Sequence, residues 1–97
     1  MKVILEDKLK DYMNEKDLKD IVVYPEVCNT WGGSYIEVLA RFANKGEKLE
    51  EKGYKKVSSE MGDVYLPAGS LKYKDTITFG MSKFLWMPRV TVGGVSA

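Results

Sequence analysis

The sequence "VCNTWGGSYI" occupies residues 27–36 and holds the only cysteine of the chain, one of its two tryptophans and a Gly-Gly pair. An apolar run, "IVVYPEVC" at 21–28, precedes the glycines, and "SYIEVLARFA" at 34–43 follows them. Glycine readily adopts the positive φ angles that a tight chain reversal needs, so this arrangement predicts a β-hairpin. Pro25 indicates an edge or a bulge, because proline cannot donate to a sheet ladder.

The second half of this hairpin fits two patterns. Ser34 and Glu37 form a capping box, which favours a helix. The competing pattern, which favours a strand, has an apolar residue at every second position: Ile36, Val38, Ala40 and Phe42. We expect a strand over 35–43 that pairs with 21–28, because a Gly-Gly pair between two apolar runs is typical of a hairpin.

A short strand and an amphipathic helix are predicted before the hairpin. "MKVIL" at 1–5 is the strand, and Glu6 or Asp7 then caps a helix that ends near Glu15 or Lys16. The apolar face of this helix is expected to carry Leu5, Leu9, Tyr12 and Met13. A helix with one apolar face persists only when it packs on something else, so we expect Leu9 and Met13 to be core residues.

After the hairpin, a polar loop at 44–53 leads into short strand patterns separated by turn residues. These patterns are "YKKVS", "VYLP", "LKYKD", "TITFGM" and "KFLWMPRVTV". Such punctuation is typical of antiparallel hairpins, not of βαβ units. The sequence therefore predicts an α+β fold in a single domain, 1–97, with one N-terminal amphipathic helix packed on mostly antiparallel short strands.

Composition narrows the function. The chain has 97 residues, 15 basic and 14 acidic side chains and no histidine. A net charge of +1 is not the footprint of a nucleic-acid-binding protein, so nucleic acid is not an expected partner. Without an imidazole, a Ser or Cys nucleophile lacks its usual base, and zinc lacks a nitrogen ligand. Acid–base work would fall to Glu26, Glu37 or Asp63, which form no recognisable pair, so we do not expect an enzyme.

The chain also carries no sign of membrane insertion or export. Its apolar runs are too short to cross a bilayer, and "MKVILEDKLK" is not a signal peptide. A lone cysteine cannot form a disulfide within the chain. We therefore expect a cytoplasmic protein with no membrane partner.

The order of elements resembles the HesB-like family, which includes the A-type iron–sulfur carriers. "CNTWGGSY" resembles the family pattern C-S-G-F-x-Y, while "VYLPAGSLKYKDTITF" and "KFLWMPRVTV" resemble its later strands. The resemblance implies the HesB-like fold, a homodimer and a role related to iron–sulfur biosynthesis, with Cys28 as a metal-ligating thiolate. The family's C-terminal C-G-C is absent, since the chain ends "VTVGGVSA", so only Cys28 is carried over.

Three candidate site residues lie in the hairpin. Cys28 is either a weak ligand for iron or an iron–sulfur cluster, or a small buried apolar residue; Arg41 is the cation across the hairpin that would activate its thiol. Trp31 and Tyr35 are candidate interaction residues, the alternative for Trp31 being a ring folded back on the sheet. A different class of function is a protein-interaction or structural domain without metal. The apolar run at 84–90 either fills the core or supports a dimer.

Overall fold

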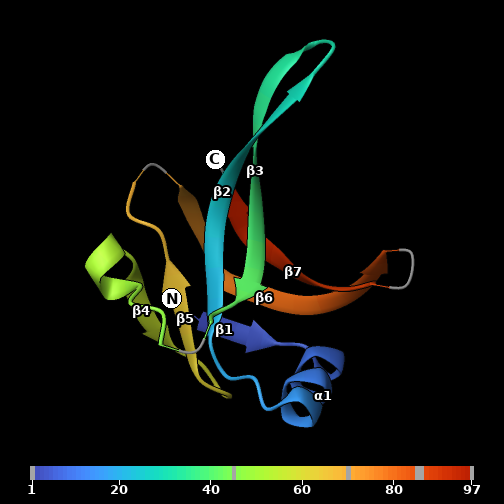
Figure 1. Cartoon of the computed structure of the whole chain (residues 1–97), viewed down its shortest axis with the longest axis vertical. Helices are drawn as coiled ribbons and strands as arrows, with labels where there is room; N and C mark the ends of the chain where they lie inside the picture. Colours follow the sequence, from blue (N-terminus) through green and yellow to red (C-terminus); the bar gives the residue numbers. More distant parts are fainter. Residues whose placement is uncertain (1, 45, 70, 85–86, 97) are drawn as a thin grey trace.

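The computed structural model describes residues 2–44, 46–69, 71–84 and 87–96, which form two sheets and one N-terminal α-helix (Figure 1). The strands are β1 (Lys2–Leu5), β2 (Ile21–Thr30), β3 (Gly33–Phe42), β4 (Lys55–Ser58), β5 (Asp63–Leu66), β6 (Lys72–Phe84) and β7 (Met87–Ser96). The helix is α1 (Asp7–Lys16), and a short 3-10 turn, η1 (Glu50–Lys52), precedes β4. The strand orders are β1-β6-β7 and β3-β2-β5-β4. The α+β class is therefore confirmed.

Both sheets are mixed. Antiparallel pairing joins β2 to β3, β4 to β5 and β6 to β7, as the turn residues predict. Parallel pairing joins β1 to β6 and β2 to β5, and the turn residues do not predict these pairs. In the first parallel pair Val3 lies opposite Ile77, far away in the sequence. Turn signals report only on neighbours along the chain, so they carry no information on such a pair.

The expected hairpin is confirmed. β2 and β3 pair without interruption from Ile21 opposite Phe42 to Thr30 opposite Gly33. The residues between these strands form the turn, and Gly33 has the positive φ, 127°. The helical alternative suggested by Ser34 and Glu37 is wrong, because the alternating apolar pattern prevails over the capping box.

The helix is also confirmed, although Glu6 at its N-cap makes no side-chain capping hydrogen bond. The expectation that Leu5 lies on the helical face is wrong, because Leu5 ends β1 and reaches the core from that strand. Leu9 and Met13 are 0% exposed and join a core that draws on both sheets. The other buried members of this core are Leu5, Ile21, Val23, Ala40, Val64, Leu66, Ile77, Phe79 and Val90. Tyr12, at the edge of the same helical face, stacks on Phe42 of β3.

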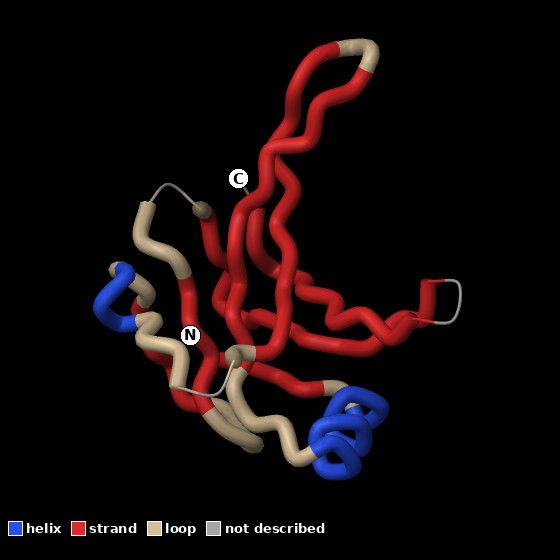
Figure 2. The backbone as a smooth tube through the Cα atoms, in the orientation of Figure 1, coloured by secondary structure: helices blue, strands red, loops and turns tan. Residues whose placement is uncertain are grey.

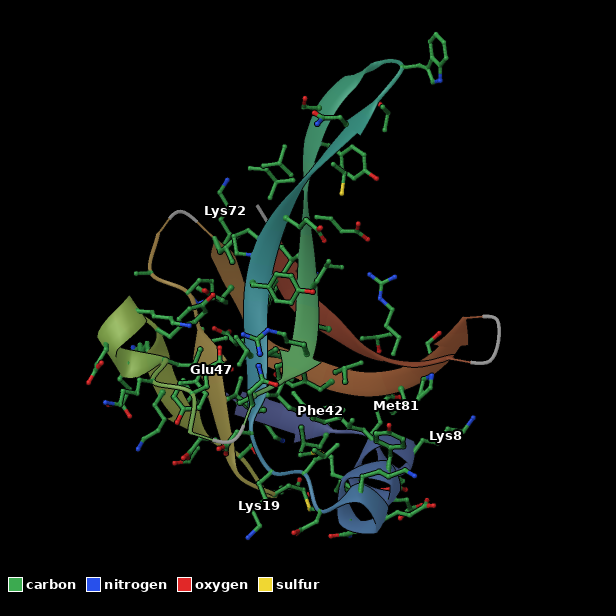
Figure 3. The ribbon with its side chains drawn as sticks, viewed as in Figure 1. Lys8, Lys19, Phe42, Glu47, Lys72 and Met81 are labelled. Atoms are coloured by element: carbon green, nitrogen blue, oxygen red, sulfur yellow. The ribbon has the colours of Figure 1, made fainter. Side chains whose placement is uncertain are left out.

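A bidentate ion pair fastens the loop after β3 to the sheet. The Arg41 guanidinium donates to both carboxylate oxygens of Glu47, at 3.0 and 2.7 Å, and the backbone N–H of Asn44 donates to the same carboxylate at 3.0 Å. Arg41 lies opposite Val22, on the face of the sheet turned away from the core. Val22 is nevertheless fully buried. The loop therefore forms a second, smaller layer, near the labelled Glu47 in Figure 3.

We expect this ion pair to make stability depend on pH. The hydrogen bonds from Arg41, then the one from Asn44, lower the pKa of Glu47 from 4.5 to about 2. A lowered folded-state pKa stabilises the fold above the unfolded value, and this contribution is lost as the pH falls from about 4.5 to about 2. Urea midpoints of wild type and Glu47→Gln should therefore differ at neutral pH and converge across this window.

Glu51→Gln is the matched control, since it removes the same charge from an exposed residue of η1. Its midpoint should stay close to that of the wild type at neutral pH. Equal midpoints for Glu47→Gln and wild type at neutral pH would contradict a stabilising role for the ion pair.

The apolar run at 84–90 is described only in part. Leu85 and Trp86 lie outside the described residues, and so do the side chains of Phe84 and Met87. Val90 is buried in the core. Among the helices of the described residues, none has the length and apolar character that a bilayer span requires.

Candidate interaction arm

The outer half of the β2–β3 hairpin, residues 25–38, extends beyond the other strands of its sheet (Figures 1 and 2). We call it the arm. β2 pairs with β5 only at Ile21 and Val22, and beyond these residues its one sheet neighbour in the described chain is β3. Val38, at the base of the arm, packs against the core, whereas residues 25–37 are exposed, apart from half-buried Cys28. The arm is therefore positioned by the core at its base and by its own ladder further out.

One face of the arm is apolar. Successive side chains of a strand point to opposite faces, so Val27 lies on the same face as the buried Ile21 and Val23. Val27 lies opposite Ile36, and the two side chains are 64% and 51% exposed. The apolar surface that forms the core at the base of the hairpin thus continues outward with no cover.

The tip carries Trp31, whose side chain is fully exposed at 108%. The alternative of a ring folded back on the sheet is therefore wrong. The turn around it is braced by polar side chains: the Thr30 hydroxyl donates to the Gly33 carbonyl at 3.1 Å, and the Ser34 hydroxyl donates to the Asn29 amide oxygen at 2.7 Å. Trp31 therefore stands exposed in a turn whose flanking residues are hydrogen-bonded to one another.

The second face of the arm holds Cys28. Its neighbours are Tyr35, directly opposite, and a cross-strand carboxylate pair, Glu26 and Glu37. The thiol is half-buried and donates to the Glu37 carboxylate at 3.5 Å. Cys28 is therefore neither fully buried among apolar side chains nor placed beside a cation that would activate its thiol.

These surroundings raise the pKa of the Cys28 thiol. Desolvation is the largest cause, followed by the hydrogen bond to Glu37, while the hydrogen bond with Tyr35 acts in the opposite direction. The cation that the sequence suggested does not lie beside the thiol: Arg41 is paired with Glu47 near the base of the hairpin. At neutral pH the thiol is therefore protonated, a form that binds metals poorly and is a weak nucleophile.

Metal-ligating and catalytic groups do not gather here. Within the described residues, no three His, Cys, Asp or Glu side chains lie close enough together to hold a metal ion. Of the carboxylates considered for acid–base work, Glu26 and Glu37 lie opposite each other in the arm, whereas Asp63 begins β5. The sequence did contain a signal for the Glu26–Glu37 pair: with residues 31–32 as the turn, pairing residues outward from it places Glu26 opposite Glu37.

An open hollow of about 980 Å³ lies beside α1. Its described lining residues include Lys8 and Met81, both labelled in Figure 3. Two lysines, Lys8 and Lys16, are balanced there by Asp11 and Glu15. These four charges cancel, so the described lining favours neither an anionic nor a cationic ligand.

Comparison of the chain with protein-family models, curated proteins and solved structures finds no match. The HesB-like resemblance and the iron–sulfur role that it implies for Cys28 therefore stay predictions.

Proposed function

We propose that this chain is a protein-interaction module, not an enzyme, and that the arm is its binding element. One observation carries the proposal. Within the described residues, the large apolar side chains that are exposed all lie in the arm: Val27, Trp31, Tyr35 and Ile36. The apolar residues of the two-sheet body are instead buried or partly buried around one core.

The physical basis is the cost of leaving such a surface in water. Contiguous apolar surface that a fold does not need for its own core is typical of binding sites, and it becomes favourable when a partner covers it. Trp and Tyr are enriched among the residues that dominate binding energy, and the arm carries exposed Trp31 at its tip and exposed Tyr35 four residues later in β3. A polypeptide partner suits this surface because an extended strand edge lies beside the apolar groups.

The proposal is tested by photo-crosslinking in cells of the source organism. The full chain carries a photoreactive benzoylphenylalanine in place of Trp31, or in place of exposed Glu51 as the matched control. We expect a defined adduct with a different protein from position 31 and not from position 51. The double substitution Val27→Ser, Ile36→Ser should reduce this adduct at least about tenfold, since two apolar contacts of about 1 kcal/mol each are lost.

Both substituted side chains are more than half exposed, so the double variant should remain folded. Circular dichroism and a urea midpoint check this. The same pattern of adducts from positions 31 and 51, or an adduct that the double substitution leaves unchanged, would count against the arm as the binding element.

The second candidate is the role implied by the HesB-like resemblance: a homodimeric cytoplasmic protein of that fold that binds iron or an iron–sulfur cluster through Cys28. The accessibility of the thiol favours it. Iron–sulfur clusters usually take four thiolates, whereas one chain supplies one and a dimer two. We therefore expect anaerobic reconstitution to give no stable cluster. A near-stoichiometric cluster that Cys28→Ser abolishes would instead establish this second role.

A further inference from the structure

The position of Pro25 shows which backbone groups of the arm point outward. Pro25 lies opposite Val38, and proline has no N–H, so this pair cannot exchange two hydrogen bonds. In an antiparallel ladder such pairs alternate with hydrogen-bonded pairs. The ladder is uninterrupted, and Ile36 and Ser34 lie two and four residues before Val38. They therefore also belong to pairs that exchange no hydrogen bonds with β2. The N–H and C=O groups of these three β3 residues therefore point away from β2.

The outward edge of β3 is open over its exposed residues 33–37. β3 is the terminal strand of its sheet in the described chain, and its residues 33–37 are exposed. The opposite edge of the arm belongs to β2, where Pro25 removes one of the donors that a further strand would need. Natural proteins protect exposed edges with such prolines and with charges. Only the β2 edge of the arm has a proline, so the β3 edge is the one suited to pairing.

We propose that a second copy of this chain pairs with this edge, β3 antiparallel to the partner's β3, so that two arms form one four-stranded sheet. The inference rests on the proposal that the arm is the binding element, and it adds a specific occupant and register. A two-fold axis requires outward-pointing residues to face one another. Three registers centre on the exposed residues 33–37 and give at least two outward-pointing residues of each β3 a partner: those with Tyr35, Ile36 or Glu37 on the axis.

Side-chain pairing selects among these three registers. With Glu37 on the axis, two carboxylates lie directly opposite each other, which is destabilising. With Tyr35 on the axis, Val38 passes beyond the partner's β3 and gains no strand partner. With Ile36 on the axis, Ile36 faces the partner's Ile36, Tyr35 faces the partner's Glu37, and Ser34 faces the partner's Val38. We therefore assign the register centred on Ile36.

This register also covers apolar surface that the monomer leaves exposed. Val27 and Ile36 are already cross-strand neighbours in one arm. Pairing adds the partner's Ile36 and then the partner's Val27 on the same face of the sheet. Adjacent strands lie about 4.8 Å apart, so the four side chains form one continuous row across the dimer.

Proline substitution tests the edge. Ile36→Pro removes an outward N–H and leaves the β2–β3 hydrogen bonds in place, whereas Val27→Pro makes the same change on the β2 edge and is the matched control. Sedimentation equilibrium of the full chain should show a dimer for wild type and Val27→Pro. Ile36→Pro should raise the dimer dissociation constant at least about tenfold, since two intersubunit hydrogen bonds of about 1 kcal/mol each are lost. If Ile36→Pro does not fold, Ile36→Lys, which places like charges on the axis, replaces it.

Disulfide trapping tests the register. In a Cys28→Ser background, Ile36→Cys should form an intersubunit disulfide when copper phenanthroline in air takes two electrons from the two thiols. The paired Cα atoms lie about 5.5 Å apart, within the range of a disulfide. Val27→Cys is the control: it lies three strand spacings, about 14 Å, from the partner's Val27 and should stay reduced.

Three outcomes overturn the inference, and a fourth overturns only the proposed function. A wild-type chain that stays monomeric up to about 1 mM has no affinity beyond about 4 kcal/mol, too little for a stable pair. A dimer that neither Ile36→Pro nor Ile36→Lys weakens uses another surface, such as the run at 84–90. If the chain is monomeric and position 31 crosslinks to a different protein, the dimer inference is wrong and the proposed function stands. An arm-paired dimer that yields no foreign adduct removes the proposed function alone.

Discussion

Phe79→Ala should lower the free energy of unfolding by about 3–5 kcal/mol. Phe79 is 0% exposed, and it lies between Leu5 of β1 and Val92 of β7 in the three-stranded sheet. Its ring belongs to the cluster that joins this sheet to the other sheet and to α1. The truncation removes a transfer contribution and leaves a cavity that the surrounding strands cannot close. Urea denaturation of both proteins at neutral pH measures the difference.

Ile36→Ala is the control for this prediction because it also shortens a strand residue of the chain. Ile36 is half exposed in the arm, so the monomer should lose well under about 1 kcal/mol. The comparison is made at low protein concentration, where the proposed dimer does not contribute. Similar losses for the two variants would mean that the central core and the arm are equally solvated, contrary to the structure.

Leu9→Ala and Met13→Ala should each lower the free energy of unfolding by about 2–5 kcal/mol. Both side chains are 0% exposed and lie one helical turn apart on the face of α1 that joins the core. α1 has only ten residues and is too short to persist alone in water, so its packing stabilises it. Denaturant midpoints of the two variants measure the effect.

Glu15→Ala, on the exposed face of α1, is the matched control and should change stability by less than about 0.5 kcal/mol. The two core substitutions adjoin each other, so the double variant need not give the sum of their effects. A loss below about 0.5 kcal/mol for both Leu9→Ala and Met13→Ala would show that the helix does not dock by this face.

The candidate site was predictable only in part. The sequence identified the hairpin that carries Trp31 and Tyr35, because Gly-Gly between two apolar runs is a local signal. It left open whether Trp31 is exposed, since a turn residue can fold back on its sheet or stand away from it. It also suggested Arg41 as a neighbour of Cys28, whereas the pairing of Arg41 with Glu47 holds the cation near the base of the hairpin. Which acidic or thiol group Arg41 pairs with depends on which of them the tertiary fold brings next to it.

The sequence by itself determined the elements formed by neighbours along the chain. Helical spacing placed Leu9 and Met13 on one face of α1, and alternation placed Val27 and Ile36 on the core-facing side of their strands. Only the tertiary structure decided which parts of these faces are covered. Parallel pairing of β5 with β2 ends at Val22, so the body covers the base of the hairpin and leaves the arm in water. Periodicity encodes the direction in which a side chain points, but burial depends on segments distant in sequence, which no local pattern specifies.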